Sequence, residues 1–289
     1  MKILEQWETK HQKKIYKGYH YHIQVFLNTA NFEITKATYR DIVSYLRLLR
    51  ISGTSVYVLK NRLSAIKFYY RCLVDFGYIQ VHPCQDLVLK DKVNKTIVTA
   101  LLYTAKELDS FLERTIGQSK HLQLRNKIIQ QILVYQGLTT SELVQLKVTD
   151  IDLEKCTITI AKSRLNARVL ELNAKQLLPL HNYISVTRIV LLNQQQSAFL
   201  LLSKTGKKIP SETLNGMLNS NFDKKFIPKR TRQSVIYHLL RKGNTLAQVQ
   251  YFAGYKDITT VEQYKNSDIE ALKQQILKNH PLNLNALTK

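Results

Sequence analysis

The sequence predicts a mostly helical chain with one small β-hairpin, an α+β fold in two domains. Apolar residues recur every three or four positions through much of the chain, which is the spacing of amphipathic helices. Apolar and polar residues alternate near residues 156–172, as in paired strands. A charged and then apolar connector, LVLKDKVNKTIVTA at residues 87–100, separates the two parts. The 289 residues are enough for two domains of ordinary size.

The first ninety residues are expected to form a helical domain. Its clearest helix begins after Gly53-Thr54-Ser55, which supplies a start signal, and Gly77 supplies the stop. The apolar stripe of this helix consists of Val56, Leu59, Leu63, Ile66, Tyr70 and Leu73. Its other faces carry Lys60, Arg62, Lys67 and Arg71. These cations either lie against phosphates or form an ordinary solvated face.

Residues 91–102 are interpreted as a linker, and residues 103–289 as the second domain. Thr104 and Glu107 form a capping box, so a helix should begin at Ala105. A second helix is expected at about 123–136, then a short one at Glu142-Leu143. Strands at 156–161 and 169–172 form the predicted hairpin. Three cations lie in or beside its turn, where they can reach into a groove or to a phosphate or keep the edge soluble: Lys162, Arg164 and Arg168.

Composition points to a polyanionic partner. The chain has 43 Lys and Arg against 21 Asp and Glu, a net charge of +22, and a pI near 9.8. Residues 1–95 hold 16 basic and 7 acidic residues and the remainder holds 27 and 14, so both parts are basic. Nucleic acid is the expected partner, and two basic parts suit a clamp around a duplex.

Other classes of protein are disfavoured. The three cysteines, Cys72, Cys84 and Cys156, are widely spaced, and no Cys or His pair has zinc-site spacing. No apolar run is long enough to span a bilayer, and the first residues lack the apolar core of a signal peptide. We therefore expect a cytoplasmic protein with no membrane partner, no metal and no small-molecule substrate.

The last sixty residues hold one constellation with chemical meaning. Lys229, Arg230 and Arg232 form a basic turn, Gly254-Tyr255 follows, and then comes Tyr264. A phosphodiester under attack spreads negative charge over its oxygens, so fixed cations are what its transition state requires. The pattern suggests a phosphate-binding site with a tyrosine nucleophile. Taken alone, it is equally a solvated basic turn and one tyrosine among sixteen.

Five segments in the same order resemble the tyrosine recombinase, or phage integrase, family over nearly the whole chain. They are VLKNRLSAIKFYYRCLVDFGYIQVHP, LVYQGLTTSELVQLKVTDID, the hairpin with Lys162 at its turn, FLLLSKTGKKIPSETLNGML and KRTRQSVIYHLLRKGNTLAQVQYFAGYKDITTVEQY. The resemblance implies a helical, SAM-like DNA core-binding domain at 1–90. It also implies an integrase-like catalytic domain at 103–289 with a C-terminal helix.

The resemblance assigns a role to each matching residue. Tyr264 would attack a DNA phosphate to give a 3′-phosphotyrosyl bond, which stores the energy for religation without ATP. Arg232 would hold the non-bridging oxygens with its planar fork. Lys162 would protonate the leaving 5′-oxygen. DNA contacts would come from Arg164, Arg168, Arg230, Lys60, Lys67 and Arg71, and no cofactor is implied.

Three positions depart from the family pattern. Thr139 stands where the first catalytic arginine is expected, Lys229 replaces a histidine, and Tyr255 replaces a histidine or tryptophan. Losing one preorganised donor costs about 10²- to 10³-fold in rate. Thr139 instead forms a capping box with Glu142, and Arg164 or Arg125 are candidates to supply the missing cation.

Two functions therefore compete. The first is an active site-specific recombinase or integrase, and the second is a non-catalytic DNA-binding or architectural protein on the same scaffold. A metal-dependent transposase has Asp150 and Asp152 to offer, which look instead like a turn before a strand. The apolar positions Ile269, Leu272 and Ile276 suggest a C-terminal helix, which either closes its own domain or docks on a neighbour in a nucleoid-associated tetramer on DNA.

We expect DNA binding to weaken steeply as salt is raised. Each phosphate contact releases condensed counterions, so the logarithm of the affinity should fall linearly with the logarithm of the salt concentration. Fluorescence anisotropy of a labelled duplex over a salt series measures the slope. A flat response would contradict a phosphate-based interface.

Overall fold

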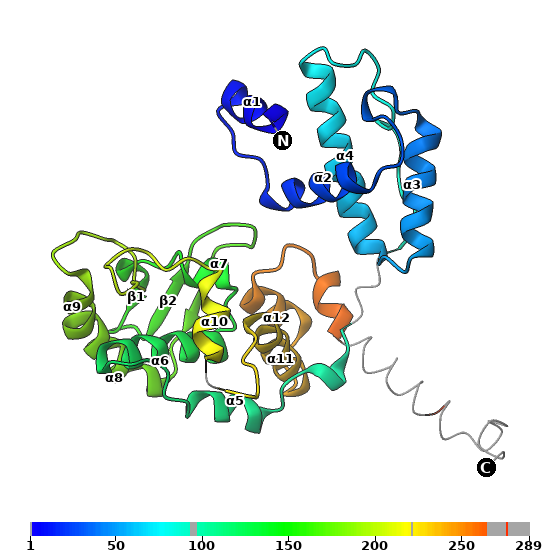
Figure 1. Ribbon diagram of the computed structural model, residues 1–289. Helices are drawn as coiled ribbons and strands as arrows, with labels where there is room; N and C mark the ends of the chain where they lie inside the picture. The colour runs from blue at the N-terminus through cyan, green and yellow to red at the C-terminus, as the bar shows by residue number, and fades with distance from the viewer. Residues whose placement is uncertain (1, 93–96, 221, 265–275, 277–289) are drawn as a thin grey trace. The chain divides into compact units, whose positions relative to one another are not determined.

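The computed structural model describes residues 2–92, 97–220, 222–264 and 276, and the chain divides into two compact units, residues 1–94 and 95–289 (Figure 1). Each unit has its own apolar core. Within the described residues no helix is both long enough and apolar enough to cross a bilayer.

The first unit is a helical bundle built on one long helix. Its helices are α1 (Lys2–His11), α2 (Lys17–Thr29), α3 (Tyr39–Ile51) and α4 (Val56–Asp75), with a 3₁₀ turn η1 (Ile34–Lys36). The predicted helix from Val56 is confirmed, and the Ser55 hydroxyl caps it by accepting a hydrogen bond from Val58 N. Tyr70 and Phe26 are fully buried in the core. Arg62 is also buried, whereas Lys60 and Lys67 are half-buried and Arg71 is exposed.

The second unit is larger and mixes helices with a small sheet. Its elements in order are η2 (Thr99–Leu101), α5 (Ala105–Leu112), α6 (Lys120–Tyr135), α7 (Thr140–Leu143), η3 (Val148–Asp150), β1 (Ile151–Asp152), β2 (Thr157–Ile160), β3 (Arg168–Glu171), α8 (Ala174–Asn182), the π-helical η4 (Tyr183–Thr187), α9 (Arg188–Leu192), α10 (Thr213–Asn219), α11 (Pro228–Arg241) and α12 (Leu246–Ala253). Residues 259–264 are helical again. The predicted capping box of Thr104 and Glu107 is confirmed.

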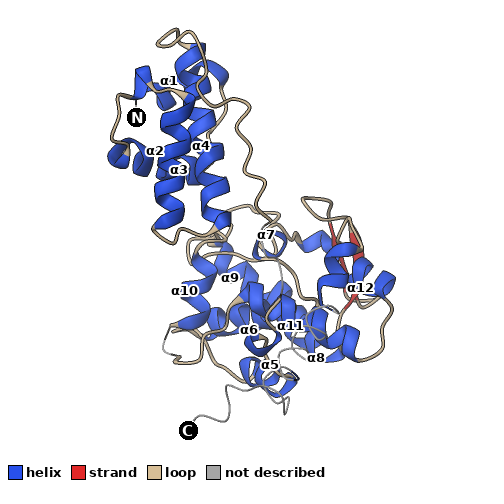
Figure 2. Ribbon diagram, turned by 90° about the vertical axis from the view of Figure 1, so that its right-hand side faces the viewer, coloured by secondary structure: helices blue, strands red, loops and turns tan. Residues whose placement is uncertain are grey.

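The sheet has three antiparallel strands in the order β1-β2-β3. The predicted hairpin is therefore confirmed as β2 and β3, but the expected turn at Asp150–Asp152 also contributes the two-residue strand β1. In the hairpin, Ile158 pairs with Leu170 and Ile160 pairs with Arg168. The strands lie beside α12 (Figure 2), which contacts β3.

Helix α6 runs through the main core of the second unit. It begins at Lys120, three residues before the predicted start, because Ser119 caps it by accepting from Leu122 N. Ile128, Ile129 and Ile132 are fully buried, and the helix packs against α5, α8 and α11. Since α6 ends at Tyr135, it delivers Gly137 and Thr139 to the region of α11 and α12.

A second apolar cluster of this unit contains Tyr264. Its buried members are Ile236 of α11, Val249 and Ala253 of α12, Val261 and Tyr264. Burial of these side chains is the main force that returns residue 264 to helices α11 and α12. Of the predicted C-terminal helix, Ile269 and Leu272 lie outside the described residues, whereas Ile276 is helical and exposed.

Candidate active site

Arg232 is the best-anchored cation of the predicted constellation. It lies on α11, which begins at Pro228, a favourable first residue of a helix. Its Nη1 donates to the Gly137 carbonyl at 2.7 Å and its Nη2 donates to the Ala253 carbonyl at 2.5 Å. These two bonds fix the plane of the guanidinium between α12 and the loop after α6. Because each Nη carries two N–H groups, donors remain for a ligand.

Tyr255 and Tyr264 lie next to this guanidinium. The Arg232 guanidinium carbon is 5.1 Å from the centre of the Tyr255 ring, and the hydroxyls of Tyr255 and Tyr264 are 3.5 Å apart. Tyr264 is 2% exposed, and this burial raises its pKa above the ordinary value, opposed by the charge of Arg232. Three residues from separate segments therefore come together, and the phenol is protonated at neutral pH.

Thr139 caps a helix, as predicted. Its hydroxyl accepts a hydrogen bond from Glu142 N at 3.2 Å, and its N–H and hydroxyl both donate to Glu142 Oε2, at 3.0 and 2.9 Å. The capping box begins α7 and places the Glu142 side chain inside the unit, where it is 5% exposed. Thr139, which stands where the family pattern has an arginine, therefore orients the carboxylate of Glu142.

Arg168 is buried, which corrects its interpretation as a DNA-contacting residue of the hairpin turn. It is the first residue of β3 and 3% exposed. Its Nη1 lies 2.6 Å from Glu142 Oε1, and its Nε donates to the Phe252 carbonyl at 2.7 Å. A signal was present in the sequence, because Arg168 shares a strand face with the buried Leu170.

Glu142 lies between two guanidinium groups. Its Oε1 pairs with Arg168, and its Oε2 is 4.0 Å from Arg232 Nη1. Burial by itself raises the pKa of Glu142, but the hydrogen bond and charge of Arg168, the Thr139 N–H and the charge of Arg232 together lower the pKa below its ordinary value. The carboxylate is thus ionised at neutral pH.

The hairpin is tied to the end of α12 by hydrogen bonds from its backbone N–H groups. Asn166 N donates to the Gly254 carbonyl at 2.8 Å, and Val169 N donates to the Tyr251 hydroxyl at 3.2 Å. Gly254 has φ +68°, and a Cβ at this position would lie 2.5 Å from Arg168 Nη1. Glycine at 254 therefore makes room for the buried guanidinium as well as the left-handed turn.

The remaining predicted cations are more exposed. Lys162 and Arg164 are exposed in the turn between β2 and β3, and Lys229 is exposed at the start of α11. Arg230 is half-buried, with its guanidinium 5.3 Å from the centre of the Tyr103 ring. No contact within the described residues joins Lys162 to Arg232 or Tyr264, so the structure brings together Arg232, Tyr255 and Tyr264 and leaves Lys162 at the hairpin turn.

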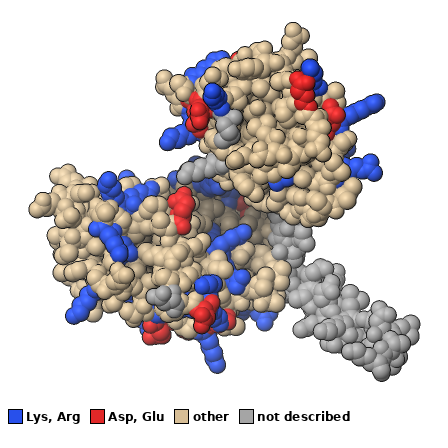
Figure 3. Space-filling view, in the orientation of Figure 1, with Lys and Arg blue, Asp and Glu red and all other residues tan. Residues whose placement is uncertain are grey.

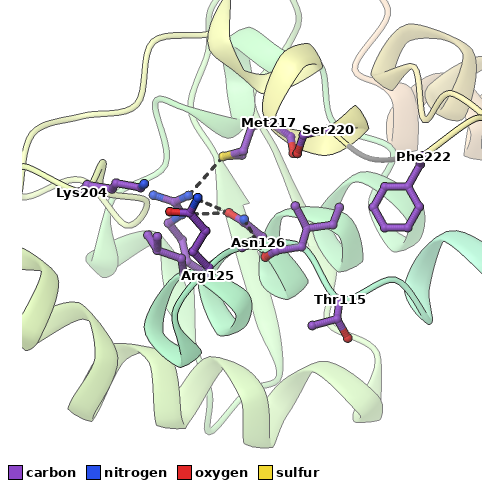
Figure 4. Close-up of a pocket in the computed structure, with 11 residues that line it drawn as sticks. Thr115, Arg125, Asn126, Lys204, Met217, Ser220 and Phe222 are labelled. Atoms are coloured by element: carbon purple, nitrogen blue, oxygen red, sulfur yellow. Dashed lines mark hydrogen bonds between the residues drawn. The ribbon is translucent and has the colours of Figure 1, made fainter.

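Arg125 does not supply the missing cation. Its Nη1 donates to the Leu202 carbonyl at 2.9 Å, its Nη2 donates to Asn126 Oδ1 at 2.8 Å, and its side chain lines a separate cavity of about 470 Å³ together with Lys204 and Met217 (Figure 4). These contacts hold α6 to the loop around residue 202. Its candidacy for the phosphate site is therefore wrong.

The surface and the acidic pair complete the description. Lysine and arginine side chains are spread over the visible faces of both units, with acidic side chains in fewer places (Figure 3).

Asp150 accepts a hydrogen bond from Lys147 N at 2.8 Å, and Asp152 accepts from Lys155 N at 2.9 Å. Both carboxylates thus serve local turns, which argues against their use as a metal-binding pair.

The sequence profile of the phage integrase family matches residues 102–271. Among curated relatives, a tyrosine recombinase XerC of Alcanivorax borkumensis is 25% identical over 249 residues, covering 84% of this chain and 80% of that protein. A tyrosine recombinase XerC of Oceanobacillus iheyensis is 25% identical over 276 residues, covering 92% and 89%.

Solved structures share the fold. The Tn1549 transposon integrase in complex with transposon right end DNA is similar with a TM-score of 0.58 and 16% identity, covering 94% of this chain and 98% of that one. XerH recombinase bound to a palindromic difH substrate is similar with a TM-score of 0.59 and 20% identity, covering 85% and 72%. At these identities the similarity concerns the fold.

We expect Gly254→Ala to destabilise the protein more than Gly243→Ala. Both glycines have positive φ, +68° and +92°, but a Cβ at 243 has no atom within 4 Å, whereas a Cβ at 254 meets the ion-paired Arg168. The shared backbone strain costs about 1–2 kcal/mol, and the clash should add about 1–3 kcal/mol at position 254. Urea denaturation followed by circular dichroism measures both variants. Equal losses would show that Arg168 moves aside freely.

Proposed function

Because the chain belongs to the phage integrase family, we propose that it is a site-specific DNA recombinase that cuts and rejoins strands through Tyr264. The observation that carries the proposal is the convergence of Tyr264, Tyr255 and Arg232 from three segments, with hydroxyl groups 3.5 Å apart and a ring 5.1 Å from the guanidinium. A phenol beside a fixed guanidinium is what nucleophilic attack on a phosphodiester requires.

In the proposed reaction the scissile phosphate lies against Arg232. The two backbone carbonyls that anchor this guanidinium leave N–H groups for two non-bridging oxygens. The Tyr264 oxygen attacks phosphorus and forms a 3′-phosphotyrosyl ester, the phenol proton passes to water, and the 5′-oxygen leaves as a hydroxyl with a proton from Lys162. Religation reverses the step, so the bond energy is conserved without a nucleotide or metal cofactor.

Three further side chains have proposed roles. Lys162, exposed on the hairpin turn, protonates the leaving 5′-oxygen as a general acid. Lys229, exposed one turn before Arg232 on α11, supplies a positive charge to the phosphate in place of a histidine. Tyr255 stacks near Arg232 and orients the Tyr264 hydroxyl.

The partner in this proposal is double-stranded DNA. The Tn1549 integrase and XerH are described in complex with DNA, and the net charge of +22 suits the same ligand. The first unit, with Lys60, Lys67 and Arg71 on α4, serves as the core-binding domain, and Arg164 and Arg230 contact phosphates near the site. We propose assembly as a tetramer on DNA and action in the cytoplasm at the nucleoid.

We expect Tyr264→Phe to abolish covalent capture of DNA while leaving binding unchanged, because the variant loses only the attacking oxygen. Duplexes enriched by the protein from a random-sequence library can be rebuilt as a panel with a nick at each successive position. A nick lets the short flanking strand diffuse away, so the covalent adduct accumulates and appears on denaturing gels.

The control is Tyr78→Phe, an exposed tyrosine of the first unit, which should form adduct like the unaltered protein. An adduct that persists in Tyr264→Phe would assign the nucleophile to another residue. Binding without any adduct in the unaltered protein would indicate the non-catalytic DNA-binding function instead.

We expect Lys162→Ala to slow strand cleavage about 10²- to 10⁴-fold, the usual contribution of a general acid, with a much smaller effect on DNA affinity. A bridging 5′-phosphorothiolate substrate should restore the rate, because a thiolate leaves without protonation. Arg164→Ala is the matched control, since it removes an exposed cation from the same turn. If Lys162→Ala lowers the cleavage rate and the DNA affinity equally, or if the phosphorothiolate substrate does not restore the rate, Lys162 only contacts a phosphate and is not the general acid.

A further inference from the structure

The buried carboxylate of Glu142 creates an electrostatic problem at the proposed phosphate site. Its Oε2 is 4.0 Å from Nη1 of Arg232, the residue that must bind the phosphate, and the side chain is 2% exposed. An ionised carboxylate so close to the phosphate-binding group repels an incoming phosphate and offsets the charge of Arg232. Charges at this separation interact strongly when water is excluded.

Arg168 changes the charge balance of this site. Glu142 and Arg232 alone sum to zero, whereas Glu142, Arg232 and Arg168 together carry one positive charge. The Arg168 side chain is 0% exposed and its Nη1 is 2.6 Å from Glu142 Oε1, which is closer than any approach of Arg232 to the same carboxylate. Arg168 therefore neutralises the negative charge of Glu142, so the positive charge of Arg232 remains available to bind a ligand.

The same guanidinium joins the hairpin to α12. Its Nε donates to the Phe252 carbonyl and its Nη1 approaches the Asn166 carbonyl at 3.3 Å. Asn166 precedes β3 in the turn that carries Lys162, and Phe252 lies two residues before Gly254. Arg168 thus ties the segment with the proposed general acid to the segment with Tyr255.

Its burial sets a limit on what Arg168 does. The side chain has no exposed surface and lies beneath Gly254, so it does not contact DNA. Its Nη2 is buried and has no hydrogen-bond partner among the described residues.

We propose that Arg168 is a positioning residue of the strand-transfer site, which neutralises Glu142 so that Arg232 keeps its full charge for the phosphate. This inference rests on the proposed function. It explains how a chain with Thr139 in place of an arginine retains a positively charged site. The second guanidinium is that of Arg168 on β3. It acts through Glu142, the carboxylate that Thr139 orients.

The test compares Arg168→Met with the double variant Arg168→Met/Glu142→Gln. Methionine retains the aliphatic volume and removes the charge, so Glu142 is left to offset Arg232. We expect cleavage of the nicked panel to fall about 10²- to 10³-fold, as for loss of a preorganised charge. Removing the carboxylate as well restores the net charge, so the double variant should cleave faster than the single one. A purely structural role predicts the opposite order, because the double variant has lost more packing contacts.

The matched control is Arg188→Met. Arg188 is also buried in this unit, but it donates to backbone carbonyls of Ser197 and Phe199 and forms no ion pair with the described residues. It should lower the melting temperature and leave cleavage at the rate of the unaltered protein. Cleavage by Arg168→Met at the unaltered rate, or a double variant no faster than the single one, would overturn the proposal.

Two measurements keep the outcome decisive. If Arg168→Met does not fold, the neutral Arg168→Gln takes its place, alone and together with Glu142→Gln; the double variant should again cleave faster than the single one, and the reverse order overturns the inference. If the unaltered protein forms no adduct, the proposed function fails, and DNA affinity by anisotropy tests Arg168 separately. Affinity should fall in Arg168→Met and recover in the double variant, and an unchanged affinity in both would reject the charge role.

Discussion

The arrangement of the second unit depends on one buried carboxylate held between two guanidinium groups. Arg168 and Arg232 come from a strand and a helix that are distant in sequence, and two like charges in one dry site repel each other. Glu142 reduces that repulsion, and Thr139 fixes its orientation through the capping box. A helix cap, a strand terminus and the proposed phosphate-binding residue are thereby linked in a single network.

The elements and their order were largely predictable from the sequence because local signals specify them. Capping residues at Ser55, Thr104 and Thr139 begin helices where expected, and the alternation around residue 158 marks the hairpin. Strand β1 was missed because two residues are too few to show a periodic pattern. Family resemblance, more than periodicity, predicted that Tyr264 and Arg232 act in one site.

The burial of the charged residues was not predictable in the same way. The predicted strand began at Val169, which left Arg168 in the turn, whereas β3 begins at Arg168 itself and places its side chain on the same inward face as Leu170. Arg125 was considered for the phosphate site as a cation that could replace the missing arginine. The contact of its guanidinium with the Leu202 carbonyl depends on how a loop 77 residues later folds back.

The close approach of Gly254 to the Arg168 guanidinium has a consequence for divergence of related sequences. A homologue that exchanges the arginine for a smaller residue relaxes the steric demand at the glycine, although the left-handed backbone still favours residues such as asparagine there. Positions 168 and 254 should therefore co-vary. The pair of residues at these positions would distinguish chains whose second guanidinium comes from the sheet from chains whose second guanidinium lies on the loop after α6.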